Sequence, residues 1–159
     1  MTVIRPADAR DVATILRFIR ELAAFEREPD AVQATEGTLT DALFGLHPAA
    51  EAVIAELDDA PVGFALFFHN FSTWTGRRGL YLEDLYVTPA GRGRGVGKAL
   101  LRHLAQLAVE RGCARFEWAV LDWNMPAIEF YDAMGAARMD EWRIRRVSGP
   151  ALARLAERG

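Results

Sequence analysis

Apolar residues recur at spacings of three and four in two long stretches of the chain, which predicts two amphipathic helices. The first follows Asp8, a candidate N-cap, and ends before Pro29. The second covers residues 94–111, where Gly112 is placed to end it. Its apolar face consists of Leu100, Leu101, Leu104, Leu107 and Ala108. Each helix therefore has one face to bury.

Shorter apolar runs, separated by turn residues, predict strands at residues 52–55, 62–68, 80–87, 113–121 and 142–147. Shorter helices are expected at residues 35–44 and 124–134, and residues 150–159 are expected to form a short tail helix. With an opening strand, the order is β-α-α-β-β-β-α-β-α-β, without a linker or repeat. This order predicts one mixed α/β domain spanning residues 1–159.

The composition is that of an ordinary soluble globular protein, with 159 residues, 51% hydrophobic and 26% charged. No apolar run is long enough to span a membrane, and the N-terminus lacks the apolar core of a signal peptide. The single cysteine, Cys113, excludes an internal disulfide and fits a reducing, cytoplasmic location. The net charge of −3 argues against nucleic-acid binding. His47, His69 and His103 lie far apart, so no metal site is expected.

A glycine-rich segment lies between the strand at 80–87 and the long second helix. It holds Gly91, Gly93, Gly95 and Gly97, interleaved with Arg92, Arg94 and Lys98. Glycines allow a positive φ and a close approach to the backbone, and a helix N-terminus attracts anions. The segment is therefore predicted to bind a pyrophosphate, although a glycine-rich turn without a ligand is the alternative.

Two familiar phosphate-binding loops do not match this segment. A Walker loop requires Ser or Thr after Gly97-Lys98, where Ala99 stands. The dinucleotide fingerprint G-x-G-x-x-G fails from Gly91, because its last position is Val96, and it fails from Gly93 as well. A nucleotide-binding protein of either class is thus disfavoured.

The spacing Arg92-Gly93-x-Gly95-Val96-Gly97 instead resembles the acyl-CoA loop of the GNAT superfamily of N-acetyltransferases. Residues 81–87 (YLEDLYV), 122–131 (DWNMPAIEFY) with Gly135-Ala136, 4–7 and 21–26 resemble segments of its spermidine/spermine (diamine) branch, in the same order. The resemblance runs from about residue 3 to 147. It implies a GNAT fold, in which a central, mixed, mostly antiparallel twisted sheet is flanked by helices.

The resemblance also implies acetyl-CoA as co-substrate, without a metal. The residues expected to contact the coenzyme are Leu85, Tyr86, Val87, Arg92, Gly93, Arg94, Gly95, Val96, Gly97, Lys98, Asn124, Pro126 and Ala127. The backbone groups of Leu85, Tyr86 and Val87 would bind the pantetheine arm. Asn124 is alternatively a helix N-cap, and both roles can hold together.

Two residues are candidates for proton transfer. The resemblance places the Tyr131 hydroxyl near the coenzyme sulfur, where it would act as general acid, and the alternative is a core tyrosine. Glu83 would recognise the amine and remove its proton, directly or through water, and the alternative is a structural ion pair at the rim. Asp84 faces the opposite side of an ideal strand, so only one of these two carboxylates is expected to point into the site.

The acceptor-binding residues implied by the resemblance are Phe25, Glu26, Trp74, Glu83 and Asp84. Carboxylates at Glu26 and Glu83 would select a cationic amine. The sequence departs from the diamine enzymes before Trp74, where an acid is replaced by residues 71–73 (FST) and the following stretch is one residue longer. Glu26 is alternatively a solvated helix-end residue and Trp74 an ordinary loop aromatic.

The resulting hypothesis is an N-acetyltransferase that transfers the acetyl group to a small cationic amine (polyamine, diamine or thialysine-like) in a ternary complex. The alternatives are a non-catalytic acyl-CoA sensor and an acetyltransferase of a protein amine. By resemblance alone, a homodimer is expected.

Overall fold

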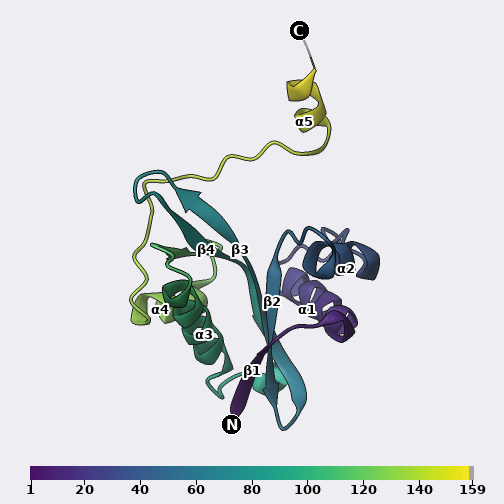
Figure 1. Ribbon diagram of the computed structural model, residues 1–159, viewed down its shortest axis with the longest axis vertical. Coiled ribbons are helices and arrows are strands. Elements are labelled where there is room, and N and C mark those ends of the chain that lie inside the picture. The colour runs from purple at the N-terminus through teal and green to yellow at the C-terminus, as the bar shows by residue number, and fades with distance from the viewer. Residues whose placement is uncertain (158–159) are drawn as a thin grey trace. The chain divides into compact units, whose positions relative to one another are not determined.

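The computed structural model describes residues 1–157, which form two compact units, Met1–Ala119 and the residues from Val120 onward. The first unit contains the sheet and three α-helices (Figure 1). Its elements are β1 (Thr2–Pro6), η1 (Ala9–Asp11), α1 (Val12–Phe25), α2 (Glu36–Phe44), β2 (Glu51–Leu57), β3 (Ala60–Ser72), β4 (Arg77–Val87), η2 (Pro89–Gly91), α3 (Val96–Glu110) and β5 (Phe116–Glu117).

The sheet has five strands in the order β1-β2-β3-β4-β5. The first four pair antiparallel with their neighbours, and β5 pairs parallel to β4. The parallel pairing is short, with Leu80 opposite Phe116 and Tyr81 opposite Glu117. The expected mixed, mostly antiparallel sheet is confirmed.

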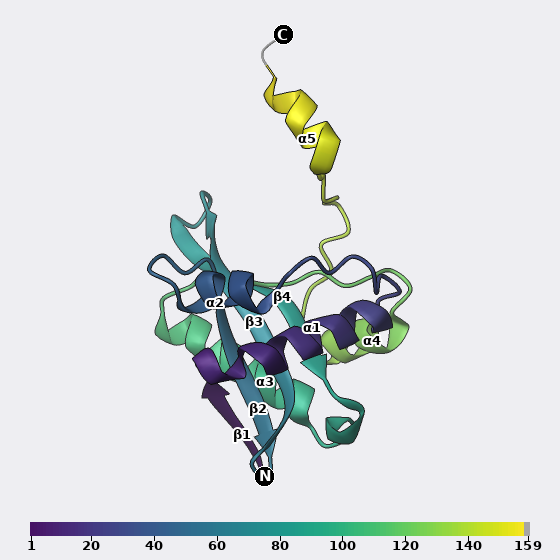
Figure 2. The same cartoon turned by 90° about the vertical axis from the view of Figure 1, so that its right-hand side faces the viewer.

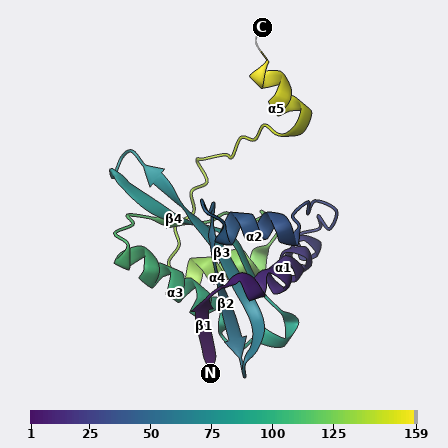
Figure 3. The ribbon, with the colours of Figure 1, turned by 45° about the vertical axis from the view of Figure 1, so that its right-hand side comes forward.

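Helices cover both faces of this sheet. Figure 2 shows α1 and α2 in front of the strands, and Figure 3 shows α3 on the other side of them. Helix α1 packs on α2, β3 and β4, whereas α3 packs on β1, β3 and β4. The α3 side chains at the sheet include the predicted Leu100, Leu101 and Leu104, all buried.

An aromatic cluster joins α1 to the middle of the sheet. The Phe18 ring, fully buried, lies 5.8 Å from the Phe64 ring and 5.7 Å from the Tyr86 ring, centroid to centroid. Tilted aromatic pairs at this distance add to the free energy gained from apolar burial. This contact fixes the middle of α1 over β4, the strand that carries Glu83, Asp84, Leu85, Tyr86 and Val87 of the predicted site.

The predicted helix ends are confirmed in the first unit. Asp8 forms a capping box with Asp11 at the start of η1, which leads directly into α1. Thr35 caps α2 in the same way with Thr38. Helix α3 ends at Glu110, and Gly112 follows with φ of 72°, a conformation that favours glycine.

The second unit contains α4 (Met125–Ala133) and α5 (Gly149–Ala156). The predicted tail helix is confirmed as α5 as far as the chain is described. Gly135 follows α4 with φ of 89°, as its placement predicted.

Two strand predictions were wrong. The strand expected at residues 113–121 is reduced to Phe116–Glu117, and residues 142–147 form no strand within the described chain. Alternating apolar residues define a strand only where a neighbouring strand takes up the backbone hydrogen bonds, and none does so here. Trp142, Ile144 and Val147 of this segment are exposed. Over residues 1–157, no helix combines the length and apolar character needed to cross a membrane.

Candidate active site

The glycine loop between β4 and α3 is open on its outer side. Gly93 and Gly95 have φ of 73° and 78°, and a Cβ atom placed on either would meet no heavy atom within 4 Å. Packing therefore does not explain these glycines, whereas the positive φ does. Their peptide groups are accessible, as an anion-binding loop requires.

The N-terminus of α3 follows this loop directly. Its N-cap is Gly95, which has no side chain to accept from the first helical amides, and the first backbone hydrogen bond runs from the Ala99 N–H to the Gly95 carbonyl (3.0 Å). The amide groups of the first turn and the partial positive charge of the helix end are thus available to an anion. Within residues 1–157, neither Arg94 nor Lys98 forms an ion pair, and both are exposed.

Arg92 differs from the other two cations of the loop. Its Nε donates to the Val87 carbonyl (3.2 Å), and its guanidinium carbon lies 5.9 Å from the centre of the Phe25 ring. A cation over an aromatic face at this distance is attracted to it. Arg92 therefore connects the loop to the C-terminal end of α1. A predicted coenzyme residue, Arg92, thus lies beside a predicted acceptor residue, Phe25.

Strand β4 is only partly covered on its β5 side. The pairing with β5 ends at Tyr81, so the edge of residues 83–87 on that side is not paired with β5. Leu85 and Val87 are half-buried, and Tyr86 is buried on the α1 side. An exposed strand edge offers N–H and C=O groups to an extended ligand arm, as the predicted pantetheine contact requires.

A β-bulge separates Glu83 from Asp84. Leu66 of β3 lies opposite Asp84 and the next residue, Phe67, lies opposite Leu82, so that Glu83 is the extra residue. A bulge bends the strand and redirects its side chains. Glu83 is exposed, whereas Asp84 is half-buried and two residues from Tyr86, so it shares the face of the sheet that α1 covers. The expected difference between the two carboxylates is thus present.

The charge around Asp84 is acidic. Burial is the main cause that raises the pKa of Asp84 to about 6, and the carboxylates of Glu83 and Glu26 add to it. Glu26, at the C-terminal cap of α1, has its own pKa raised by burial. Among residues 1–157 no ion pair involves any of these three carboxylates. We call Glu26, Glu83 and Asp84 the acidic cluster.

A fourth carboxylate, which the sequence did not single out, lies beside it. Burial and a hydrogen bond to Glu21 of α1 raise the pKa of the Tyr86 phenol. The other oxygen of Glu21, Oε2, is buried and has no hydrogen-bond partner within the described chain. The available signal in the sequence was the apolar periodicity of α1, in which the buried Ile15 and the half-buried Leu22 are seven residues apart and Glu21 is next to Leu22. This periodicity indicates a helix face, but it does not indicate that Glu21 contacts β4.

Trp74 lies apart from this cluster within the chain. It is 86% exposed, in the turn between β3 and β4. Leu66 is opposite Asp84, and Ser72, at the base of the turn, lies six residues farther along β3. At about 3.3 Å per residue, this corresponds to about 20 Å. The structure does not bring Trp74 together with Glu26 and Asp84.

The remaining predicted residues belong to the second unit. Asn124 caps α4, with its side-chain oxygen accepting from the Ala127 N–H (3.4 Å), and Pro126 lies in the first turn. The N-cap role of Asn124 is thus confirmed. Tyr131 is half-buried on α4, with its ring 5.6 Å from that of Phe130. The coenzyme contacts of these residues stay predictions.

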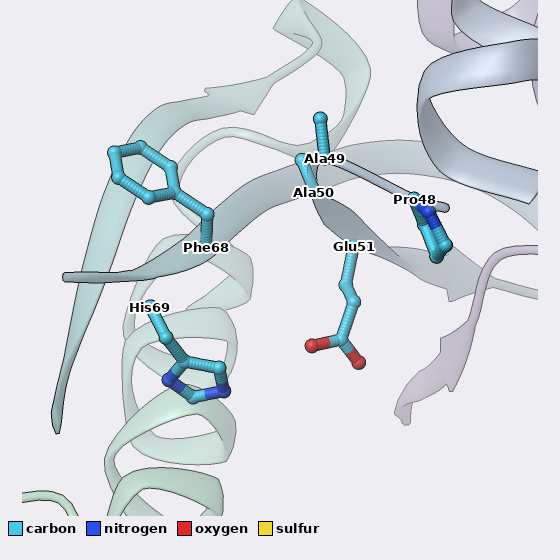
Figure 4. Close-up of a pocket in the computed structure, with 6 residues that line it drawn as sticks. All are labelled: Pro48, Ala49, Ala50, Glu51, Phe68 and His69. Atoms are coloured by element: carbon cyan, nitrogen blue, oxygen red, sulfur yellow. The ribbon is translucent and has the colours of Figure 1, made fainter.

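A different polar network lies near the start of β2. Arg111 donates to both oxygens of Glu51 (2.6 and 2.9 Å) and lies 2.9 Å from His69 Nε2. Because arginine is only a donor, Nε2 accepts, and His69 Nδ1 donates to the Gly79 carbonyl (2.9 Å). Glu51 and His69 line a small pocket with Pro48, Ala49, Ala50 and Phe68 (Figure 4). These hydrogen bonds give His69 a structural role.

No group of three or more His, Cys, Asp or Glu side chains in residues 1–157 is arranged to hold a metal ion. Whether the protein uses a metal is not decided by that arrangement, and the metal-free reaction stays a prediction.

Comparison with known proteins agrees with this geometry. The profile of the Acetyltransferase (GNAT) family matches residues 15–136. The chain is 40% identical to the thialysine N-epsilon-acetyltransferase of Sus scrofa, over 97% of this chain and 96% of that protein. It is 37% identical to the Homo sapiens spermidine/spermine N(1)-acetyltransferase-like protein 1, over 96% of this chain and 23% of that protein.

A solved structure is similar over the whole chain. An integron cassette protein from the mobile metagenome of V. cholerae superposes with a TM-score of 0.82 at 29% identity, covering 99% of this chain and 98% of that one. The matched family profile spans more than half of the sequence, and it includes most of α1, strands β2 to β5 and the glycine loop. The chain therefore belongs to the GNAT family of acetyltransferases.

Proposed function

We propose that this protein transfers the acetyl group of acetyl-CoA to a primary amine of a small cationic acceptor, with both substrates bound at once. The observation that carries the proposal is the course of β4. Its end, at Val87, leads into the open glycine loop, and Asp84, three residues earlier, belongs to the acidic cluster. Three residues of a strand span about 10 Å. One strand therefore joins an anion-binding loop to a cation-binding cluster.

GNAT enzymes use acetyl-CoA as co-substrate, and this chain has groups that fit it. The backbone of Leu85, Tyr86 and Val87 would hold the pantetheine arm, and the loop from Arg92 to Lys98 would hold the pyrophosphate. Arg94 and Lys98 supply the exposed positive charge, whereas Arg92 orders the loop through Val87 and Phe25. From the second unit we assign Asn124, Pro126 and Ala127 to the coenzyme.

The acceptor is proposed to be a small molecule that carries at least one ammonium group. Three carboxylates that form no ion pair within residues 1–157 favour such a ligand, because a nearby positive charge stabilises their ionised forms. The names of the relatives, thialysine and spermidine/spermine acetyltransferases, fit the same class. Phe25 would pack against the acceptor beside Glu26. Trp74 lies beyond Ser72, which is itself about 20 Å from Asp84 along the hairpin, so Trp74 is kept only for a long acceptor such as a polyamine.

Bound acetyl-CoA would supply an activated acetyl thioester, and the chain would position the amine and manage its protons. We assign the Tyr131 hydroxyl as the acid that protonates the departing sulfur. Replacing Tyr131 with Phe should lower kcat about 100-fold or more and change the Kd for acetyl-CoA less than twofold. An unchanged kcat would remove Tyr131 from this role.

The activity is tested by thiol release from acetyl-CoA with a panel of amines: thialysine, lysine, spermidine, spermine, putrescine and aminoglycosides. We expect turnover with thialysine or a polyamine. Silence with every amine, while acetyl-CoA still raises the melting temperature, would favour the alternatives, a sensor or an enzyme that acts on a protein amine. Silence without a thermal shift would contradict coenzyme binding by the glycine loop.

Four further properties stay proposals. We expect one functional domain, because the matched family profile extends from residue 15 to 136 and so covers parts of both units. We expect a homodimer by resemblance to the family alone. A location in the cytoplasm fits the single Cys113. We expect no nucleic-acid or membrane partner. Analytical ultracentrifugation tests the dimer directly.

A further inference from the structure

Two neighbouring carboxylates on β4 differ in their surroundings, although either could serve the proposed reaction. Glu83 is the extra residue of the bulge and is exposed. Asp84 is half-buried on the face that carries Tyr86 and that α1 covers. Glu26, at the C-terminal cap of α1, and Glu83, on the same strand, are both close enough to Asp84 to act on it electrostatically.

We propose that Asp84, and not Glu83, removes the proton from the acceptor ammonium. The proposal rests on the amine acetyltransferase activity proposed above. It assigns different roles to adjacent carboxylates. Glu83 and Glu26 attract the cationic acceptor, and Asp84 accepts its proton.

Burial makes Asp84 the better proton acceptor of the two. A solvated carboxylate keeps a low pKa and is a weak base toward an ammonium group, whereas a half-buried carboxylate beside two others binds a proton more readily. The pKa of about 6 is consistent with this environment, and its largest cause is burial. A base with a pKa near the working pH is efficient, because it is mostly ionised and still holds a transferred proton.

Among residues 1–157, the charged groups found to act on Asp84 are carboxylates. Strand β4 carries Glu83 and, two residues on, the phenol of Tyr86, which is bonded to Glu21 of α1. From α1 comes Glu26, and from β3 the apolar Leu66 lies opposite. Within residues 1–157, no ion pair neutralises Asp84. The first cation to reach it is therefore expected to be the acceptor.

The proton balance of the step is simple. An N–H bond of the ammonium breaks, and its proton moves to a carboxylate oxygen of Asp84. The neutral nitrogen then uses its lone pair to form a bond to the thioester carbonyl carbon, the C–S bond breaks, and the second proton lost by nitrogen ends on sulfur. The products are the amide, the free thiol and protonated Asp84, which returns its proton to solvent.

The pH dependence of kcat/KM distinguishes this route from its alternative. With Asp84 as base, the bound form of the acceptor is the ammonium. At saturating acetyl-CoA, kcat/KM for thialysine, or for the panel amine that is turned over fastest, should be level between about pH 6.5 and 8.5. It should fall about tenfold per pH unit below about 6. A rate that instead rises tenfold per unit through pH 6–9 would overturn the proposal, since the amine would then lose its proton in solution.

Substitutions assign the ionisation to one residue. Asp84→Asn should lower kcat/KM about 100-fold or more and remove the break near pH 6, with the Kd for acetyl-CoA unchanged within twofold. Glu83→Gln should keep the break in the pH profile and move it to lower pH, and it should lower kcat/KM less than about tenfold. The matched control is Asp59→Asn in the β2–β3 turn, where asparagine tolerates the positive φ of 63°. If Glu83→Gln removes the break and Asp84→Asn keeps it, the roles are reversed and the proposal is wrong.

A direct titration separates failure of this proposal from failure of the proposed function. Carboxyl ¹³C NMR of the protein without substrates should show Asp84 titrating near pH 6, and at lower pH in Glu83→Gln and in Glu26→Gln. Titration of Asp84 near its ordinary pKa would overturn the proposal even in an active enzyme. A wild type that acetylates no amine would overturn the proposed function and this role together.

Discussion

Two of the groups of partly buried charges in the first unit are organised in opposite ways. Glu51, Arg111 and His69 form a closed network in which each charge or ring nitrogen has a partner in the chain. The hydrogen bond from Arg111 is the main cause that lowers the pKa of Glu51. In the acidic cluster the pKa values of Asp84 and Glu26 are raised instead.

The difference indicates which charges serve the fold and which serve a ligand. A carboxylate with an arginine partner stabilises the folded state, whereas a half-buried carboxylate beside other carboxylates destabilises it until a cation binds. Proteins tend to keep such unfavourable groups at functional sites. The contrast between the two groups supports the acidic cluster as the amine site. Substitutions in either group can test it.

The largest expected effect on stability is that of Asp84→Asn. A pKa of about 6 in place of the ordinary 3.8 corresponds to at most about 3 kcal/mol against the folded state. Because the folded state binds this proton more tightly, the cost is absent below about pH 4, develops between pH 4 and 6, and is complete above 6. Urea unfolding should show Asp84→Asn more stable than wild type by about 1–3 kcal/mol at pH 7.5, and nearly equal at pH 4.

Arg111→Met should lower the stability of the folded protein, by somewhat less than Asp84→Asn raises it. It removes the pair with Glu51 and leaves His69 Nε2 without its donor, at a cost of about 1–2 kcal/mol. Urea unfolding at pH 7.5 is the measurement, and kcat for the accepted amine should change less than twofold. A large loss of turnover with unchanged stability would mean that this network also belongs to the site.

Glu51→Gln should cost less, because the Glu51 side chain is 47% exposed and solvent weakens the pair. The pKa of Glu51 is lowered from 4.5, so its contribution is present above that pH and is lost as the pH falls through the folded-state pKa. We expect a loss of about 0.5–1 kcal/mol at pH 7.5 and almost none at pH 3. A loss that grows on acidification would contradict this sign.

The smallest effect is that of salt on the acidic cluster. Sodium chloride at 1 M shortens the screening length to about 3 Å, which weakens the repulsion of Asp84 by Glu83 and Glu26 but not the effect of burial. The NMR pKa of Asp84 should therefore fall slightly and stay above 5. A return to the ordinary value of 3.8 would show that repulsion, and not burial, is the main cause.

Local signals in the sequence predicted much of the fold and part of the site. The cap at Asp8 and the helix stops at Gly112 and Gly135 depend on neighbouring residues alone, and these are confirmed. The open glycine loop was predicted for the same reason. The strand at residues 142–147 was wrong, because a strand requires a partner that an alternating pattern does not supply.

The sequence by itself determined the helices, the turns, the glycine loop and, through its resemblance to a family, the class of reaction. Tertiary structure alone decided how the charges of the first unit are used. The bulge that separates Glu83 from Asp84 depends on the register between β3 and β4. The contact of Glu21 with Tyr86 depends on where α1 crosses β4. A carboxylate has the same letter whether an arginine or another carboxylate lies beside it, and only the packing of distant segments determines which neighbour it meets.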